Sequence, residues 1–455
     1  MDFEAKTTSF LQWFRCIPGA SFSDAIEIAD FRSRNAGRGI TAKRDISADE
    51  TLFIIPRKAI ISVETSSLRQ RLPYLFESCG DGDDEQALDS WSGLILVLMY
   101  EFLLESSQWK PYLEILPDAF DTPMFWSDEE LAELQASAVR CKIGKTEADN
   151  LFRTKLLPII RRHPDVFGVG NDVGDEQLVQ LAHRMGSTIM AYAFDMENDE
   201  QDEQEGEDGW VEDSEEKHVM GMVPMADILN ADAEFNAHVN HGDDALTVTS
   251  LRPIEAGQEI LNYYGPHANS ELLRRYGYVT AKHARYDVVE IPWRIVKNAV
   301  MDHVGVSEQM LQDACKRLDE DQLEDVFILE RQTCEPWPDG TLASPALVQE
   351  MPEELHAQLK ALLKALQKGN AGLVKDKRKR DDSMRAILIK SLLAVESQYS
   401  TLSGQDEAIL RQTLGQRKRM AVEVRLGEKK LLQEAKAALS DNTGHEEASK
   451  RVRVD

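Results

Sequence analysis

The strand-like segments of this chain fall into two blocks that a long helical stretch separates, and this order limits the possible folds. Short β-branched and apolar runs occupy residues 1–65 and return at residues 218–290. Helical patterns fill residues 66–195 and the chain from residue 291 onward. A doubly wound α/β fold would instead alternate single strands with single helices. The order predicts an α+β fold, in which a helical insertion splits a β-rich domain and an all-α domain follows.

The domain boundaries are placed where the dominant pattern changes. We expect the first part of the β-rich domain at 1–65, the helical insertion at 66–195, an acidic loop at 196–217, the second part of the β-rich domain at 218–290, the all-α domain at 291–445 and a basic tail at 446–455. No internal repeat is visible, so a solenoid or other repeat architecture is not expected.

Individual strands are predicted where short β-branched or apolar runs lie between turn residues. They are Leu52–Ile55, Ala59–Val63, Leu246–Ser250 and Glu259–Gly265. Helices are predicted at Trp91–Glu105, Leu131–Ala138 and Leu178–Phe194, and after Pro292 we expect helices to the end. Ser127 and Glu130 have the spacing of a capping box, which predicts a helix start at Ser127.

The charge balance is strongly acidic, with 52 basic and 80 acidic residues among 455 and a net charge of −28. The run Glu197–Glu216 alone supplies 12 of the acidic residues and no Lys or Arg. This balance excludes a generally basic nucleic-acid binder and is compatible with a basic partner. The acidic run itself is typical of a solvated, largely disordered loop, and the alternative is that it attracts a basic substrate segment.

The cysteine pattern argues against a disulfide framework or a zinc cluster, because the five cysteines are far apart and form no CxxC pair. His238 and His241 form an HxxH pair without a nearby cysteine, so we expect no metal. The apolar stretch near Gly93–Leu104 is interrupted by Glu101 and is too short to span a bilayer. No secretory signal is visible at Met1–Glu4.

Three short motifs are weak when each is taken alone. Gly37-Arg38-Gly39 is typical of a tight turn, and it lacks the third glycine and following helix of a dinucleotide fingerprint. Asn230 either ends a strand or holds the polar end of a small ligand with its side-chain amide. Tyr264 and Tyr276 both stand beside glycines, either as core aromatics or as hydroxyls and rings that line a pocket.

Taken together and in this order, the motifs resemble the SET-domain protein-lysine methyltransferases. Supporting stretches are Trp109-Lys110-Pro111-Tyr112, Pro123-Met124-Phe125-Trp126 and Met190-Ala191-Tyr192-Ala193-Phe194. The helical insertion and helical C-terminal part resemble the branch typified by the Rubisco large-subunit methyltransferase, and within it the group of SET-domain-containing protein 6 and fungal ribosomal lysine methyltransferases. The resemblance covers residues 15–440 and implies a split SET domain followed by a C-terminal substrate-binding domain.

The resemblance also implies a site. Residues implied to hold S-adenosyl-L-methionine are Gly37, Arg38 and Gly39 through their backbone, with Tyr192, Asn230, Ala231 and Tyr276. Tyr264 is implied to be the catalytic tyrosine at the methyl-transfer channel, and Trp109, Ala193 and Asp195 to lie near the substrate. One departure is Ala231, which stands where the family usually has histidine; since the family uses mainly the backbone at that position, the alanine can still serve.

The resemblance implies an S-adenosylmethionine-dependent enzyme that monomethylates a lysine of a large-subunit ribosomal protein. The expected partner is a basic protein, a ribosomal protein or a histone, with no nucleic acid, metal or membrane, and the protein is expected to be a monomer. One alternative is a non-catalytic SET-fold module that holds a basic partner, and another is a methyltransferase that acts on histones or other nuclear proteins. A third is a nucleic-acid or ribosome-associated factor, which two basic clusters would support. These clusters, Lys377–Arg380 and Lys450–Arg453, together with the resemblance predict the nucleus, and the cytoplasm is the alternative.

Overall fold

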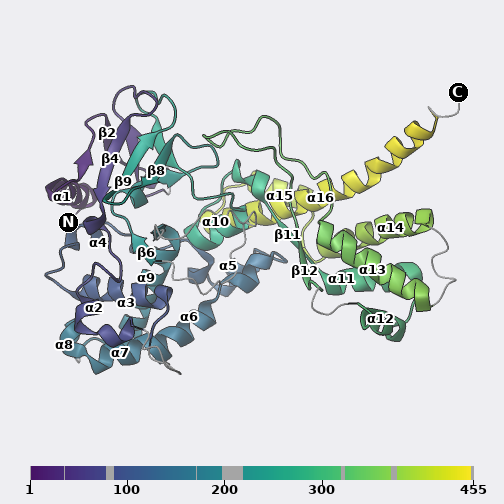
Figure 1. Ribbon diagram of the computed structural model, residues 1–455, viewed down its shortest axis with the longest axis horizontal. Helices are drawn as coiled ribbons and strands as arrows, with labels where there is room; N and C mark the ends of the chain where they lie inside the picture. The colour runs from purple at the N-terminus through teal and green to yellow at the C-terminus, as the bar shows by residue number, and fades with distance from the viewer. Residues whose placement is uncertain are drawn as a thin grey trace. The chain divides into compact units, whose positions relative to one another are not determined.

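The computed structural model (Figure 1) describes residues 2–34, 36–77, 87–170, 172–196, 219–318, 323–369 and 377–451. The predicted acidic loop lies outside these residues, except for Met196, and so do Cys79 and the last four residues of the basic tail. The chain divides into two compact units. The first unit comprises Met1–Phe120 and Gly144–Tyr264, and the second comprises Asp121–Ile143 and Gly265–Asp455.

The first unit contains strands from both sides of the helical insertion. They are β1 (Ser21–Phe22), β2 (Ile26–Asp30), β3 (Arg38–Ala42), β4 (Thr51–Pro56), β5 (Ala193–Met196), β6 (Val219–Met222), β7 (Asn230–Ala231), β8 (Ala237–His241), β9 (Ala245–Ser250) and β10 (Glu259–Asn262). Two four-stranded sheets have the orders β1-β4-β9-β8 and β2-β3-β10-β7, and β5 pairs with β6. Each four-stranded sheet joins strands from before and after the insertion, which confirms the split β-rich domain.

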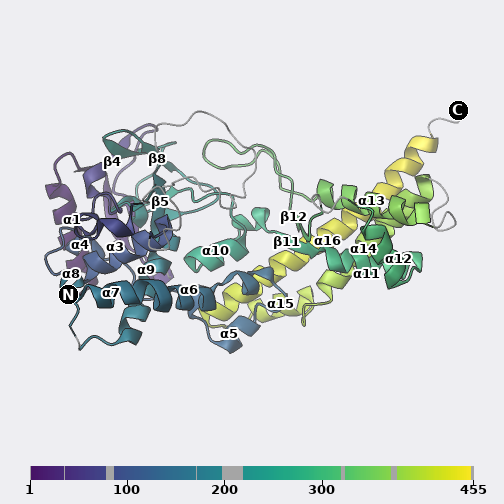
Figure 2. The same cartoon turned by 60° about the horizontal axis from the view of Figure 1, so that its bottom comes forward.

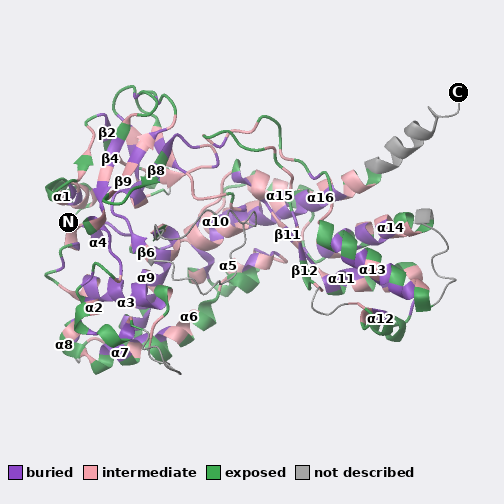
Figure 3. Cartoon of the chain, viewed as in Figure 1, coloured by how far each residue is buried: buried purple, intermediate pink, exposed green. Residues whose placement is uncertain are grey.

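The helices of the first unit include one strongly apolar helix, α3, which contacts α4 and α9. They are α1 (Phe3–Cys16), α2 (Leu68–Arg71), α3 (Ser90–Leu103), α4 (Lys110–Leu113), α6 (Lys145–Leu151), α7 (Leu157–Arg162), α8 (Pro164–Phe167) and α9 (Asp175–Tyr192). The buried face of α3 is visible in Figure 3, and α9 lies beside it. The one buried acid of α3, Glu101, accepts hydrogen bonds of 2.7 Å from Ser66 and from Ser107. These bonds satisfy both oxygens of a carboxylate that burial would otherwise destabilise.

The second unit is mainly helical and has its own apolar core. Its elements are α5 (Asp128–Ala132), α10 (Asn269–Tyr276), β11 (Val289–Pro292), α11 (Trp293–Val304), α12 (Glu308–Cys315), β12 (Val326–Leu329), α13 (Glu353–Gly369), α14 (Lys377–Glu396), α15 (Ser403–Leu410) and α16 (Gln416–Arg451). In Figure 2, α11, α13 and α14 lie close together, and α11 and α16 both contact α14. Leu355, Leu359, Leu362 and Leu366 recur at helical spacing along α13 and are buried. The α+β fold class is confirmed.

Two predictions for the first unit are wrong: one strand is absent and one helix is shorter than expected. Ala59–Val63 forms no strand: a short 3₁₀ turn ends at Ala59, and only Ile61 makes an isolated bridge, to Met222. The reason is local, because the Thr65 hydroxyl donates to the Ile60 carbonyl at 2.8 Å and closes a turn instead. The predicted helix to Phe194 ends at Tyr192, since the next residues pair with β6.

The second unit also departs from the prediction. The capping box at Ser127 is confirmed, with hydrogen bonds in both directions to Glu130. The helix that it starts ends at Ala132, because Gln135 adopts a positive φ of 53° and binds Thr401 with its side chain. Residues after Pro292 are not all helical, since β12 pairs with β11 in an antiparallel ladder.

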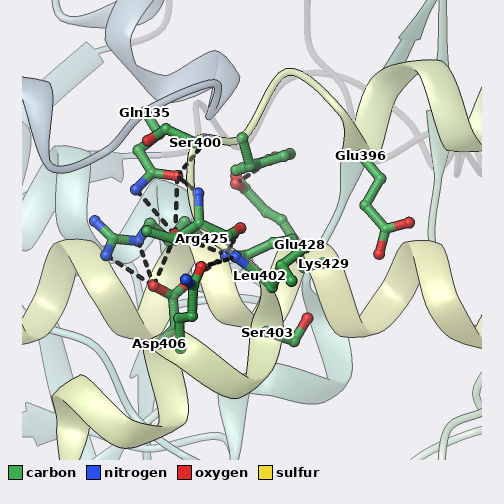
Figure 4. A network of polar contacts seen from close by, with 12 residues as sticks. Gln135, Glu396, Ser400, Leu402, Ser403, Asp406, Arg425, Glu428 and Lys429 are labelled. Carbon is green, nitrogen blue, oxygen red and sulfur yellow. Dashed lines mark hydrogen bonds and ion pairs between the residues drawn. The ribbon is translucent and has the colours of Figure 1, made fainter.

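A buried network of charges connects α15 and α16 of this unit (Figure 4). The Asp406 carboxylate accepts hydrogen bonds from Arg425 and Thr401 and forms an ion pair with Lys429. Arg425 also reaches Glu133 at 3.0 Å. The side chains of Asp406, Arg425 and Lys429 are at most 1% exposed. Because the members of the network are hydrogen-bonded to one another, the cost of removing the charges from water is offset.

Candidate active site

The Gly37–Gly39 turn leads into β3 at the inner part of a four-stranded sheet. Gly37 has a φ of +64°, which is the region that favours glycine. A Cβ atom on Gly39 would lie 2.6 Å from the Phe31 ring and 2.8 Å from the Asn230 amide nitrogen. The turn therefore needs glycine for two different reasons, one conformational and one steric, and it brings bare backbone close to Asn230.

Asn230 is joined to this turn by hydrogen bonds that cross the sheet. Its amide nitrogen donates to the Arg38 carbonyl oxygen at 3.2 Å and to the Glu259 carboxylate at 2.7 Å. The strand β7 that begins at Asn230 pairs in parallel with β10, opposite Leu261, and β10 pairs with β3. Residues about 190 positions apart in the sequence thereby form one polar cluster.

Tyr264 follows β10, and its hydroxyl donates a hydrogen bond of 2.6 Å to the carbonyl oxygen of Leu229. Leu229 is the neighbour of Asn230, so the phenol lies beside the polar cluster. A phenol held by a main-chain carbonyl has its position and its proton fixed. The sheet therefore assembles the glycine turn, the asparagine and the tyrosine, which the sequence places in three separate segments.

The Arg38 side chain has a structural role. Its guanidinium donates to the Thr7 hydroxyl at 2.9 Å and to the Ile115 carbonyl at 3.0 Å, and it stacks 4.0 Å from the centre of the Phe3 ring. Burial lowers its pKa from the ordinary arginine value. Arg38 thus offers its backbone to the site, and its side chain attaches the turn to α1 and to the segment after α4.

These features agree with what the comparisons with known protein families find. The family model described as "SET domain" matches residues 37–265, which is half of the chain and includes the glycine turn, Asn230 and Tyr264. This chain belongs to the SET-domain family. A second family model, described as "Rubisco LSMT substrate-binding", matches residues 307–432 of this SET-domain protein. The family and the two-domain organisation implied by the resemblance are thereby confirmed.

Similar curated proteins are named as lysine methyltransferases. Ribosomal lysine N-methyltransferase 4 of Saccharomyces cerevisiae is 33% identical over 322 residues, which are 69% of this chain and 63% of that protein. N-lysine methyltransferase SETD6 of Mus musculus is 27% identical over 93% of this chain and 88% of its own length. The yeast protein and three of the SETD6 proteins are matched over only 48% to 64% of their own lengths.

Solved structures share the fold of this SET-domain protein. A crystal structure of the SET domain of LSMT bound to lysine and AdoHcy has a TM-score of 0.65 and 18% identity, and the match covers 97% of this chain and 92% of that one. A structure of Rubisco LSMT bound to AdoMet has a TM-score of 0.62 at 18% identity, over 96% and 92% of the two chains. At this identity the likeness shows a common fold.

The other predicted site residues are placed in different ways. Ala231 is in β7, opposite Asn262 of β10, so its backbone lies beside the cluster. Ala193 and Asp195 are in β5 and pair with β6. Tyr192 precedes them at the end of α9. Their roles in binding stay predictions from the resemblance.

Two predicted residues have placements that the sequence did not suggest. Trp109 is 2% exposed, and its indole nitrogen donates to the Ala59 carbonyl at 2.8 Å, so the ring is part of the core of the first unit. Tyr276 belongs to the second compact unit, where it ends α10 and burial raises its pKa. The substrate role of Trp109 and the cofactor role of Tyr276 stay predictions from the resemblance.

The prediction missed two groups next to the cluster. The Glu259 carboxylate accepts a hydrogen bond of 2.7 Å from Asn230 and one of 2.8 Å from Arg34. It thereby joins the asparagine to the segment before the glycine turn. Asp227 accepts a hydrogen bond of 2.5 Å from the Tyr112 hydroxyl. Burial raises the pKa of Asp227 to about 7. Acidic residues are so numerous in this chain that the sequence offers no signal to select these two.

The described part of the chain shows neither a metal site nor a membrane span. There, no group of three or more His, Cys, Asp or Glu side chains is arranged to hold a metal ion. Among the helices that the structure describes, none combines the length and apolar character needed to cross a membrane. The polar cluster in the β2-β3-β10-β7 sheet is the candidate active site.

Proposed function

We propose that this SET-domain protein is an S-adenosylmethionine-dependent protein-lysine N-methyltransferase. The observation that carries the proposal is the Tyr264 hydroxyl held on the Leu229 carbonyl, beside Asn230 and the glycine turn. Membership of the SET-domain family and the names of the similar curated proteins support it. The substrate-binding model matched at residues 307–432 supports a protein substrate.

The glycine turn is suited to hold the cofactor through its backbone. A Cβ atom at Gly37 would meet no other atom within 4 Å, so the space beside this turn is open, whereas the close contacts of Gly39 keep the chain near Asn230. Asn230 and the backbone of Ala231 adjoin this turn and complete the proposed pocket with Tyr192. When bound, S-adenosylmethionine supplies an electrophilic methyl group.

The remaining chemistry belongs to the residues of the chain. A target lysine must be neutral to accept the methyl group, and at pH 7 this costs roughly 4–5 kcal/mol from a pKa of ~10.4. A desolvated channel with aromatic walls lowers the lysine pKa, because burial disfavours the ammonium. Tyr264, fixed by Leu229, orients the amine, and such positioning provides most of the rate enhancement.

We further propose that the substrate is a basic protein of the large ribosomal subunit and that one methyl group is added. The name of the similar yeast protein supports a ribosomal substrate, and the net charge of −28 favours a basic partner. The protein is proposed to act as a monomer in the nucleus, which light scattering and a fluorescent fusion would test. A histone is the other candidate substrate, and the assay below includes it.

The test is to incubate the purified protein and methyl-labelled S-adenosylmethionine with total ribosomal proteins and, separately, with core histones. Tyr264→Phe should lower labelling at least tenfold while the cofactor dissociation constant changes little, because only the hydroxyl is lost. Mass spectrometry of the labelled band would give the lysine and the number of methyl groups.

Tyr263→Phe is the matched control. The ring of Tyr263 stacks on the ring of Phe235 with centroids 4.7 Å apart, and the substitution keeps the ring at position 263. It should label like wild type. Labelling by Tyr264→Phe at the wild-type rate would contradict the proposal. Failure of wild type both to label and to bind the cofactor would instead favour a non-catalytic module that holds a basic partner.

A further inference from the structure

One acidic residue lies between the candidate site and the helical insertion. Asp227 is the middle residue of a single 3₁₀ turn, Ala226–Ile228, that directly precedes Leu229 and Asn230. Met225, just before the turn, has a φ of +84°, which is a strained conformation for a residue with a side chain. Such a conformation persists only where surrounding contacts hold it.

The contacts of Asp227 provide such an anchor. The Tyr112 hydroxyl of α4 donates to its Oδ2 atom at 2.5 Å, and the tyrosine is fully buried. The Oδ1 atom is buried and has no hydrogen-bond partner in the described part of the chain. Burial raises the pKa of Asp227 to about 7, and the hydrogen bond from Tyr112 acts in the opposite direction. The carboxyl thus joins the turn that directly follows Met225 to α4.

The same turn supports both polar residues of the candidate site. The Leu229 carbonyl that receives the Tyr264 hydroxyl lies two residues after Asp227. Asn230, which donates to Arg38 and Glu259, lies three residues after it. A small displacement of the turn would therefore move the tyrosine's acceptor and the asparagine at once, and methyl transfer depends on alignment of the reacting atoms.

From this arrangement we infer that Asp227 is a positioning residue for methyl transfer, which acts with Tyr112 by fixing the turn that holds Leu229 and Asn230. The inference rests on the proposed methyltransferase function. Asp227 acts through the main chain of the turn, and the groups that face it are Tyr112 from α4 and Tyr192 from α9. Burial raises the pKa values of both phenols, so both are neutral. No basic side chain among the described residues balances the negative charge of an ionised Asp227.

The first experiment compares Asp227→Ala with Asp227→Asn. The alanine variant should lower the labelling rate at saturating S-adenosylmethionine by roughly 10- to 100-fold. The half-saturating cofactor concentration should change less than about threefold, because the glycine turn is intact. Asparagine can still accept the Tyr112 hydrogen bond, so Asp227→Asn should recover most of the lost rate. In the free protein, hydrogen exchange of the Ala226–Asn230 amides should be at least tenfold faster in the alanine variant.

Tyr112→Phe provides a second route to the same pair. Tyr112→Phe should also lower the labelling rate. The Asp227→Ala/Tyr112→Phe double variant should be no slower than Asp227→Ala, because the two residues act as one unit. Glu428→Gln is the matched control: it replaces another buried acid, on α16, and should leave the rate unchanged.

The results separate this inference from the proposed function. If wild type neither labels any protein nor binds the cofactor, the proposed function fails and this inference fails with it. If wild type labels its substrate and folded Asp227→Ala labels within twofold of it, the positioning role is overturned and the methyltransferase function stands. A double variant whose loss equals the product of the two single losses would also overturn the inference.

Discussion

The two compact units each bury a tyrosine against a carboxyl group, and the two pairs differ in how fully the carboxyl is satisfied. In the second unit, Glu428 accepts from Tyr399 at 2.9 Å and from Ser137 at 2.6 Å, one bond to each oxygen. In the first unit, Asp227 has Tyr112 on one oxygen and no partner on the other among the described residues. A buried polar group without a partner costs stability, so its presence in a folded protein calls for an explanation. The difference separates a structural pair from one beside the candidate active site.

The Asp406 network extends the same contrast, because it satisfies several buried charges at once. Arg425, Lys429 and Thr401 all contact one carboxylate. The hydrogen bonds from Arg425 and Lys429 lower the pKa of Asp406 against the effect of burial, whereas burial dominates at Asp227. Two buried aspartates of one chain therefore have pKa shifts of opposite sign.

The largest effect is expected for Asp406→Ala. The substitution leaves Arg425 and Lys429 buried without their shared counter-charge, which should lower the free energy of unfolding by about 3–5 kcal/mol. Hydrogen exchange of the α15 and α16 amides would measure the loss. Glu407→Gln on the same helix is the control, since its pair with Lys430 is about half exposed and should contribute less than about 1 kcal/mol. Equal effects of the two variants would refute a stabilising role for the network.

A smaller effect should appear in the pH dependence of stability. Asp227 has a pKa of about 7 when folded and 3.8 as its ordinary value, so wild type loses stability as the pH rises from about 4 through 7. Asp227→Asn lacks this titration and should gain about 2–3 kcal/mol relative to wild type between pH 5 and pH 8. Thermal unfolding of both proteins across this range would measure the gain.

Asp406→Asn should show the opposite slope. The pKa of Asp406 is lowered, so its contribution is present above the ordinary aspartate pKa and is lost as the pH falls. The difference between wild type and this variant should therefore shrink below about pH 4. Parallel pH profiles for the two asparagine variants would show that the two carboxyls do not differ as described.

The smallest effect is expected for Tyr399→Phe. It removes one of the two hydrogen bonds of Glu428 and should cost about 1 kcal/mol of unfolding free energy, measured by urea titration. Its labelling rate should match wild type, whereas Tyr112→Phe should lower the rate. If Tyr399→Phe lowered the rate as strongly, the phenol–carboxyl pair of the first unit would have no special relation to the site.

Features that depend on neighbouring residues were predictable from the sequence. The capping box at Ser127 needs only the spacing to Glu130, and the apolar helix α3 follows from its composition. The glycine turn, Asn230 and Tyr264 were selected because their order resembles a known family, and the structure brings these three together through β3, β7 and β10. Periodicity alone would have left each motif as a turn or a strand end.

Features that depend on distant partners were not predictable. Asp227 and Tyr112 are 115 residues apart, and local patterns carry no information on which acid meets which phenol. Trp109 belongs to a stretch that resembles the family, but its burial depends on packing and on the Ala59 carbonyl. The strand β12 was not predicted, because its four residues lie among helices and are stabilised by pairing with β11.

The pairing of β3 with β10 has a consequence for synthesis on the ribosome. Ile40 and Ile260 are partners in this sheet, so one side of the candidate site is translated about 220 residues before the other. At 5–20 residues per second, the interval is roughly 10 to 40 seconds. During that time the β2-β3 hairpin has an unpaired inner edge, which is a surface open to aggregation. A growing chain therefore completes its candidate active site late, and this strand edge stays unpaired while the helical insertion is being made.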